Sequence, residues 1–464
     1  MAHSRAFQNH FFLIVFSALA ALGCGNVWNL PLNESAAIGL FIYFLVKIIK
    51  NLGRTVWVFV DVISLLLVLT CLVTPLFFYH YFTDSSALAV LWVKFMPVTA
   101  DVYYSYTLPA SLSLIAGFNI PIIGRKELKH TIKTYIAIGQ LRRPAKLGLQ
   151  LILISLLALF FKSFAPSSLG FVLFLLIKLI FVGFLYIYFS DKKPNIKWIA
   201  IAGILLLVQS LQSAMFGELI FMTLLAVIIF TYGKRYNILL KTGVLAVGLI
   251  GILIIQSVKH EYRQTVWGNS SGGTGANIAL FATLAGQNIQ GESGVFSEEK
   301  LFFTAIRFNQ GWLVASVMKN VPSRVPFAGG ETIWQSLLAS VAPRFLWPNK
   351  PEAGGKANIK RFLGWDLRGT SMNIGLLGEA YANFNAWGGC LFLFCYGLAF
   401  QWAYNVVIRL THRFPTLILW IPLLFYYCIG VENDVLTVVN HLTKTSFFVY
   451  VLFKIYPRLS NIRL

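Results

Sequence analysis

The second half of the chain contains charged residues that could act together on an anionic ligand. They are five cations and one acid: Lys259, Arg263, Arg307, Arg344, Lys350 and Glu379. Arginine binds phosphate through a planar fork, and lysine binds it as a point charge. For Arg307 two interpretations stay open, a solvated helix face and an anion ligand. For Glu379 the two interpretations are a functional acid in an apolar segment and an acid that forms a salt bridge to one of the arginines.

The segment Pro343–Pro351 places aromatic and basic side chains close together in the sequence. Its three prolines fix the backbone angle φ, so we expect a rigid segment that presents Arg344 and Lys350 beside Trp347. A tryptophan face can stack on a sugar ring as well as in a protein core. Five of the twelve tryptophans lie in the same region: Trp267, Trp312, Trp334, Trp347 and Trp365.

The elements that position these residues are predicted to lie in a membrane. Of 464 residues, 57% are apolar and 12% are charged, whereas a soluble domain has about 25% charged residues. This composition excludes an ordinary soluble enzyme, a disordered protein and a disulfide scaffold. Apolar runs of about 16–24 residues suit helices that cross a bilayer. We predict an all-α polytopic protein with twelve spans: 10–30, 35–50, 56–80, 101–122, 147–164, 168–190, 197–214, 217–232, 239–258, 374–408, 415–431 and 436–457.

The distribution of the positive charges predicts an orientation for this single transmembrane domain. Most lysines and arginines outside 259–370 fall in segments that share one side if both termini are cytoplasmic. Spans one to nine then occupy 1–258, the large loop 259–370 is extracytoplasmic, and spans ten to twelve occupy 371–464. Within the loop, residues 297–321 have helical periodicity, which predicts one amphipathic helix.

The net charge of +21 is explained by this topology and by contact with anionic lipid better than by nucleic acid. The basic stretch 125–146 is therefore interpreted as a solvated membrane-surface segment. The five cysteines form no CxxC pair and are expected to serve packing. No metal site and no cofactor are predicted.

Two motifs resemble those of the oligosaccharide repeat-unit (O-antigen) polymerase family, the Wzy type. They are Pro343-Arg344-Phe345-Leu346-Trp347-Pro348-Asn349-Lys350-Pro351 and Gly378-Glu379-Ala380-Tyr381-Ala382-Asn383-Phe384, with Gly388 after the second. The layout of many spans with one long outer loop, and the Arg307 helix running into Val321-Pro322, add to the resemblance. The motifs lie within 259–390, and the first half of the chain matches in hydropathy alone.

The resemblance implies a GT-C-like, metal-independent, inverting glycosyltransferase of the bacterial inner membrane. Its substrates would be undecaprenyl-diphosphate-linked oligosaccharides as donor and acceptor, with membrane lipids and a chain-length regulator as further partners. Arg307 and Arg344 would clamp the diphosphate, and Glu379 would orient or deprotonate the acceptor hydroxyl. The substrate would also contact Lys259, Arg263, Trp347, Lys350, Tyr381 and Asn383.

Two other functions fit the same layout. An O-antigen ligase would use the same type of donor and transfer finished glycan to a lipid A core. A lipid-linked oligosaccharide flippase would need polar groups along a path through the membrane, and Lys178 is the main candidate there.

Overall fold

The computed structural model describes residues 2–53, 58–82, 96–120, 144–162, 164–166, 169–190, 196–231, 234, 236–268, 273–290, 297–344, 346–367 and 371–460. The structure is 81% helix, and these residues contain no strand. Most of the basic stretch 125–146 lies outside them. The first half of the chain forms α1 (Ala2–Trp28), α2 (Leu32–Asn51), α3 (Val58–Val68), the π-helical turn η1 (Leu69–Val73), α4 (Thr74–His80), α6 (Ala100–Asn119), α8 (Pro144–Phe161), α9 (Gly170–Tyr188), α10 (Ile196–Ser213) and α11 (Gly217–Thr231).

The second half is helical to the same degree. It forms α12 (Ile238–Gly268), α13 (Thr274–Gln290), α14 (Glu298–Phe308), α15 (Gly311–Asn320), α16 (Glu331–Val341), α17 (Lys356–Leu363), α18 (Gly375–Leu410), the 3₁₀ helix η3 (Pro415–Trp420), α19 (Ile421–Leu424), α20 (Tyr426–Ile429) and α21 (Val435–Ser460).

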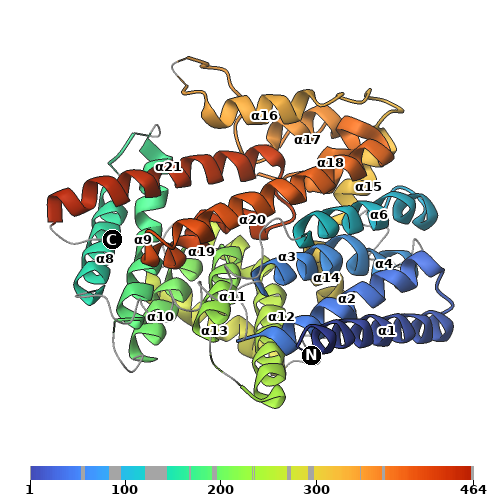
Figure 1. Ribbon diagram of the computed structural model, residues 1–464, viewed down its shortest axis with the longest axis horizontal. Helices are drawn as coiled ribbons and strands as arrows, with labels where there is room; N and C mark the ends of the chain where they lie inside the picture. The colour runs from blue at the N-terminus through green and yellow to red at the C-terminus, as the bar shows by residue number, and fades with distance from the viewer. Residues whose placement is uncertain are drawn as a thin grey trace.

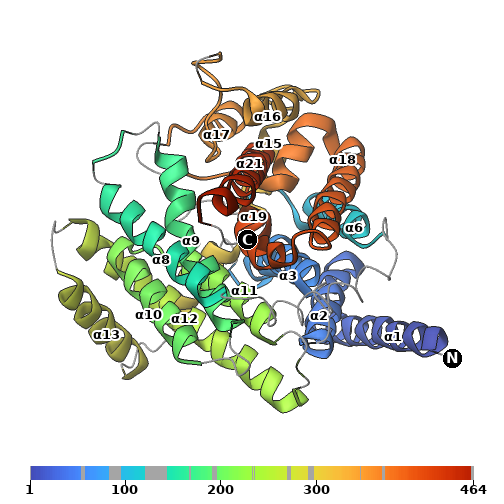
Figure 2. The same cartoon turned by 60° about the vertical axis from the view of Figure 1, so that its left-hand side comes forward.

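The helices assemble as neighbouring pairs around a central group. Helix α6 packs along α18, α8 along α9, and α1 along α2 (Figure 1). Figure 2 shows α21 nearly end-on in the middle of the molecule, with α18 on one side and α9 on the other. Helices α16 and α17 lie together at one edge in both views, and in Figure 2 α1 and α13 lie on opposite sides of the molecule.

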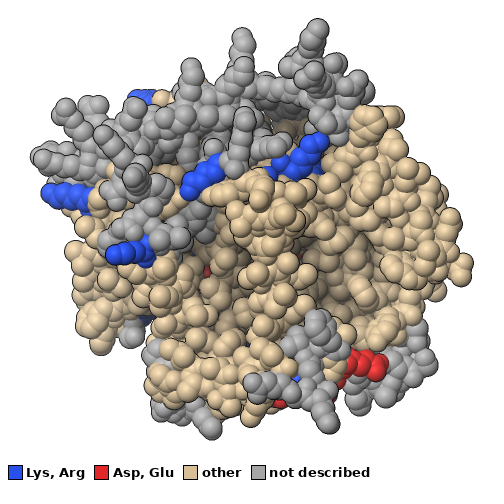
Figure 3. All heavy atoms as spheres, turned by 90° about the horizontal axis from the view of Figure 1, so that it is seen from below, with Lys and Arg blue, Asp and Glu red and all other residues tan. Residues whose placement is uncertain are grey.

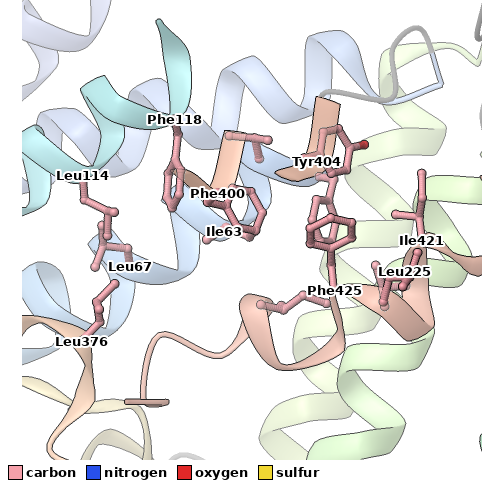
Figure 4. Close-up of a cluster of buried hydrophobic side chains, with 14 of the residues drawn as sticks. Ile63, Leu67, Leu114, Phe118, Leu225, Leu376, Phe400, Tyr404, Ile421 and Phe425 are labelled. Atoms are coloured by element: carbon pink, nitrogen blue, oxygen red, sulfur yellow. The ribbon is translucent and has the colours of Figure 1, made fainter. Parts of the chain in front are cut away.

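The centre of the molecule is an apolar core in which distant segments meet. Figure 4 shows Phe118 of α6 beside Phe400 of α18, with Phe425 between α18 and α11. The rings of Phe118 and Phe400 are 5.1 Å apart, and those of Phe400 and Phe425 are 5.5 Å apart. Aromatic pairs at these separations stabilise a core beyond simple area burial. They join the early helices to the last quarter of the chain.

Within the described residues, seven helices are long and apolar enough to cross a membrane. They are Phe11–Trp28, Leu32–Asn51, Val58–His80, Gly170–Tyr188, Ile238–Gly268, Gly375–Leu410 and Val435–Lys454. This supports the prediction of a helical membrane protein, while the number of twelve spans and their orientation stay predictions. In Figure 3 basic side chains gather along one border and acidic ones at the opposite border, with a broad uncharged surface between them. That distribution is typical of a protein with a lipid-facing belt.

Two of the predicted spans are interrupted. The segment 415–431 is not one helix but η3, α19 and α20. Pro422 lacks the N–H that a helix continuing from η3 would donate to a preceding carbonyl. Helix α18 is broken at Asn385, whose φ of 60° and ψ of −165° are non-helical. The Oδ1 atom of Asn385 accepts hydrogen bonds from the N–H groups of Trp387 and Gly388, at 3.0 and 3.4 Å. It thereby caps the second half of the helix.

The region predicted as the large loop, 259–370, is mostly helical. Helix α12 continues to Gly268, so Lys259 and Arg263 belong to the end of an apolar helix rather than to a loop. The single amphipathic helix predicted for 297–321 is two helices, α14 and α15. They separate at Gln310, whose N–H leaves the helical pattern and donates to the carbonyl of Thr70 at 3.0 Å.

Lys178 of α9 forms an ion pair with Glu218 of α11. Its ammonium group also lies 5.1 Å from the centre of the Phe174 ring. The lysine side chain is 4% exposed and the glutamate side chain 22%. An isolated charge inside a membrane protein is costly, and pairing reduces that cost. The pair therefore ties α9 to α11 rather than leaving Lys178 as a lone charge.

Close packing of α6 on α18 requires glycine at the crossing point. A Cβ atom on Gly117 would lie 2.4 Å from the Phe394 carbonyl oxygen and 2.9 Å from the Gly397 Cα. We predict that Gly117→Ala lowers the free energy of unfolding by about 1–3 kcal/mol, the usual cost of overpacking. Thermal unfolding in detergent micelles measures this. Gly243→Ala on α12, where a Cβ meets nothing within 4 Å, is the matched control, and equal shifts for both variants would refute the prediction.

Candidate functional site

Three cations converge where α14 packs against the end of α12. We call Lys259, Arg263 and Arg307 the cationic cluster. Lys259 and Arg263 are four residues apart on α12, so they lie on one face of that helix. Arg307 is in the last turn of α14, and the charges of Lys259 and Arg263 are within electrostatic reach of it. All three residues are half-buried.

The cationic cluster has no carboxylate partner among the described residues. In the part of the chain that the structure describes, no ion pair involves any of its three members. Arg263 instead donates from Nε to the Ala214 carbonyl at 2.9 Å, and its guanidinium lies 4.7 Å from the Trp267 ring centre. Burial, and then the charge of Arg263, lower the pKa of Arg307 to about 10. Arg307 therefore stays protonated at neutral pH, and an anion would relieve the like-charge repulsion.

Helix α14 is held firmly in the position that presents Arg307. The buried Phe302 packs against Phe78 and Phe82 with ring centres 5.9 and 5.0 Å apart. On the other side, the His260 ring of α12 stacks on Phe303 at 5.8 Å. These contacts fix α14 between α4 and α12, so the backbone that carries Arg307 is held in place.

A second group of polar residues surrounds Glu379 near the start of α18. We call Glu379, Asp434, Asn358, Thr332 and Asn383 the carboxyl network. Glu379 Oε1 accepts hydrogen bonds from Thr332 Oγ1 at 3.2 Å and from Asn358 Nδ2 at 3.3 Å. Its Oε2 accepts one from the Val435 N–H at 2.8 Å. Glu379 is 0% exposed, so the network joins α16, α17, α18 and α21 around a buried acid.

Asp434 is the other acid of the carboxyl network. Its Oδ2 accepts from Asn358 Nδ2 at 3.3 Å, so one amide group bridges both carboxyl groups. Its Oδ1 accepts from the Thr437 N–H at 2.9 Å and caps α21. Burial raises the pKa of Asp434 above its ordinary value. Sequence reasoning assigned no role to Asp434 or Asn358, although an aspartate directly before a helix is a recognisable capping signal.

The predicted site residues Glu379 and Asn383 are both hydrogen-bonded to other protein groups. No ion pair joins Glu379 to an arginine among the described residues, so the salt-bridge interpretation was wrong there. Asn383 donates to Thr332 Oγ1 at 2.7 Å, and its Oδ1 accepts from the Gly330 N–H at 3.1 Å. Both side chains are therefore engaged in holding α16 to α18. The described residues contain no group of three or more His, Cys, Asp or Glu side chains suited to a metal ion.

The remaining predicted site residues lie near the end of α16 or on α18. Arg344 pairs with Glu352 at 2.9 Å, and both side chains are exposed. Lys350 donates from Nζ to the carbonyls of Ala339 and Ala342, at 2.8 and 2.5 Å. Trp347 is half-buried. Tyr381 is half-buried as well, with its ring centre 5.0 Å from that of Tyr106.

Lys350 closes the C-terminal end of α16, where carbonyl groups lack helical partners. We predict that Lys350→Met, which keeps the chain length but removes the donor, lowers the free energy of unfolding by about 1–2 kcal/mol. Protease resistance of the 331–351 segment in detergent reports this loss. Lys356→Met, an exposed lysine at the start of α17, is the control, and an unchanged cleavage rate for Lys350→Met would contradict the capping role.

The predicted site residues thus separate into groups with different surroundings. The cationic cluster brings Lys259, Arg263 and Arg307 together, as a shared anion site requires. Glu379 and Asn383 belong to the carboxyl network, and Arg344 and Lys350 are bound to Glu352 and to the end of α16. The ion pairs and hydrogen bonds described above do not connect these groups to one another.

Comparison with known proteins gives a family but no activity. No curated protein matches the chain, and no solved structure does. A family model described as "Domain of unknown function (DUF8712)" matches residues 62–425, from α3 to the residue after α19. That match includes the cationic cluster and every member of the carboxyl network except Asp434. The chain therefore belongs to the DUF8712 family.

Proposed function

We propose that the protein is an integral-membrane glycosyltransferase that polymerises polyprenyl-diphosphate-linked oligosaccharide repeats. The observation that carries the proposal is the cationic cluster. It places three half-buried basic side chains beside the end of an apolar helix, and no ion pair within the described residues neutralises them. A lipid diphosphate suits such a place because its tail is apolar and its head group is an anion. The resemblance of the two sequence motifs to the Wzy-type polymerases supports the same substrate class.

The proposed reaction is a displacement at the anomeric carbon of the donor glycan. An acceptor hydroxyl oxygen forms the new glycosidic bond while the bond from the carbon to the diphosphate oxygen breaks, with inversion. The electron pair of that bond leaves with the diphosphate, and the hydroxyl proton passes to water or to a diphosphate oxygen. Arg307, Arg263 and Lys259 stabilise the developing negative charge. Pre-positioned donors of this kind lower a barrier by about 3–4 kcal/mol each.

Within this proposal Glu379 acts as a positioning residue rather than as the base. Its two carboxyl oxygens already accept three hydrogen bonds, and it is fully buried. An acceptor hydroxyl does not reach it in this conformation. The carboxyl network instead holds α16 and α17, with Trp347 and Arg344 between them, on the membrane helices. Arg344 can meet a substrate only after leaving Glu352, an exposed pair worth little free energy.

The direct test is reconstitution of the purified protein in lipid vesicles with synthetic polyprenyl-diphosphate oligosaccharide. The proposal expects a ladder of products that differ by one repeat, with release of polyprenyl diphosphate. Transfer of glycan to added lipid A core, without a ladder, would identify a ligase. Movement of the intact lipid between leaflets without glycosidic bond formation would identify a flippase. Either result would replace the polymerase proposal.

A further inference from the structure

Helix α16 buries its hydroxyl side chains together with Ile333 and Ala339, and exposes most of its large apolar side chains. Facing α18 and α21 are Thr332, Ser336 and Ser340, which are 6%, 3% and 4% exposed. Facing outward are large apolar side chains. They are Trp334, Leu337, Leu338 and Val341, which are 62%, 42%, 45% and 73% exposed. A helix on a water-soluble surface shows the opposite arrangement, with its apolar stripe turned toward the core.

The buried side of α16 has the spacing found where helices pack inside membranes. Thr332, Ser336 and Ser340 are four residues apart, so they form one stripe along the helix. Small residues at that spacing let helix backbones approach closely, and such stripes are typical of helix contacts in lipid. Helix α16 packs along α21, a candidate membrane-spanning helix. Its neighbour α18 also turns large apolar side chains outward, with Trp387 and Leu391 86% and 66% exposed.

Protein groups satisfy the backbone at both ends of α16, as an apolar environment requires. At the N-terminal end, the Gly330 N–H donates to Asn383 Oδ1 and the Gly329 N–H donates to the Asn383 carbonyl at 3.0 Å. At the C-terminal end, the Lys350 ammonium group donates hydrogen bonds to the carbonyls of Ala339 and Ala342.

Charged pairs mark the limits of the apolar strip. Glu331 pairs with Arg361 at 2.7 Å at one end, and Arg344 pairs with Glu352 at the other. The 11 residues of α16 correspond to a length of about 16 Å at 1.5 Å per residue. This is the pattern of a helix that lies at the membrane interface, with its ends among head groups and its apolar side among acyl chains.

We infer that α16 is an interfacial membrane helix whose outward face, Trp334, Leu337, Leu338 and Val341, contacts the acyl chains of bilayer lipids. Helix α16 itself is then not part of a water-exposed loop but lies against the lipid at the membrane interface. The partner is the hydrocarbon of the membrane rather than water or a second protein. The inference goes beyond the proposed reaction because it depends on the faces and ends of α16 and not on any substrate.

Site-directed spin labelling of the full chain in lipid nanodiscs tests this inference. Leu338→Cys and Val341→Cys are labelled in a background in which the five native cysteines are replaced by alanine. Leu391→Cys on α18 is the lipid-facing reference, and Ser323→Cys, an exposed serine after α15, is the water-facing reference. We expect both α16 labels to be accessible to oxygen and protected from a nickel chelate, as at Leu391. Accessibility like that of Ser323 would overturn the inference, and protection from both reagents would show a protein partner and overturn it too.

A second measurement keeps the native cysteines, in case the cysteine-free background does not fold. Tryptophan fluorescence is recorded in vesicles of ordinary and of bromine-labelled phosphatidylcholine, because bromine quenches rings that lie among acyl chains. Trp334→Phe is expected to lower the quenched fraction, whereas Trp420→Phe, which removes a fully buried ring, is expected to raise it. An unchanged fraction for Trp334→Phe would refute contact with the acyl chains.

Discussion

Arg307→Ala is expected to reduce polymer formation by about 10²–10³-fold, the usual cost of removing one pre-positioned electrostatic donor. Arg307 is the member of the cationic cluster on α14, the helix that Phe302 and Phe303 pack between α4 and α12. Loss of its charge leaves Lys259 and Arg263 to stabilise the diphosphate alone. The measurement is the initial rate of polyprenyl diphosphate release in vesicles, normalised to folded protein.

Two variants separate loss of charge from loss of structure in that experiment. Arg307→Lys keeps the charge but loses the planar fork, so an intermediate rate is expected. Arg324→Ala removes an exposed arginine after α15 that forms no ion pair in the described structure, and its rate is expected to stay near wild type. Equal rates for Arg307→Ala and Arg324→Ala would end the assignment of the anion site.

Glu379→Ala is expected to destabilise the protein by about 3 kcal/mol or more. The substitution leaves the Thr332 hydroxyl, the Asn358 amide and the Val435 N–H without their acceptor, and each such buried donor costs about 1–3 kcal/mol. Helices α16, α17 and α21 lose their common contact at the same time. Thermal unfolding of the purified protein in nanodiscs measures the change.

The comparison of Glu379→Gln with Glu379→Ala refines this prediction. The glutamine oxygen can still accept from Thr332 and Asn358, but its amide then faces the Val435 N–H as a second donor. We therefore expect an intermediate loss of stability, with polymer formation falling in step with folded protein. Glu352→Ala, at an exposed acid, serves as the control. A Glu379→Ala protein that unfolds like wild type yet makes no polymer would show that the acid contacts the reacting groups instead.

Apolar runs predicted the positions of the helices because burial and lipid contact both depend on local hydropathy. The interruptions depend on single residues. Pro422 is visible in the sequence, and its effect could have been anticipated. The break at Asn385 could not, because it is a non-glycine residue with positive φ whose side chain caps the following turn.

In the candidate site, too, contacts within one helix could be predicted from the sequence, whereas contacts between distant segments could not. Lys259 and Arg263 share a helix face by spacing alone, so their association follows from the sequence. Arg307 joins them through the packing of α14 on α12, which only the three-dimensional structure reveals. The residues that share the carboxyl network with Glu379 were not predicted, for the same reason. Asp434 and Asn358 lie on other elements, and hydropathy contains no signal for a hydrogen bond between them.

The Lys178–Glu218 pair constrains how the protein is made. When α9 first leaves the ribosome and enters the membrane, α11 has not yet been synthesised, and a lysine at the centre of a membrane helix costs about 2.5–3.5 kcal/mol. Until Glu218 has been synthesised, α9 either stays beside the insertion machinery or enters the lipid with an unpaired lysine. Helices α9 to α11 are therefore expected to leave the translocon as one unit, and a nascent chain that stops before α11 should be recognised and degraded.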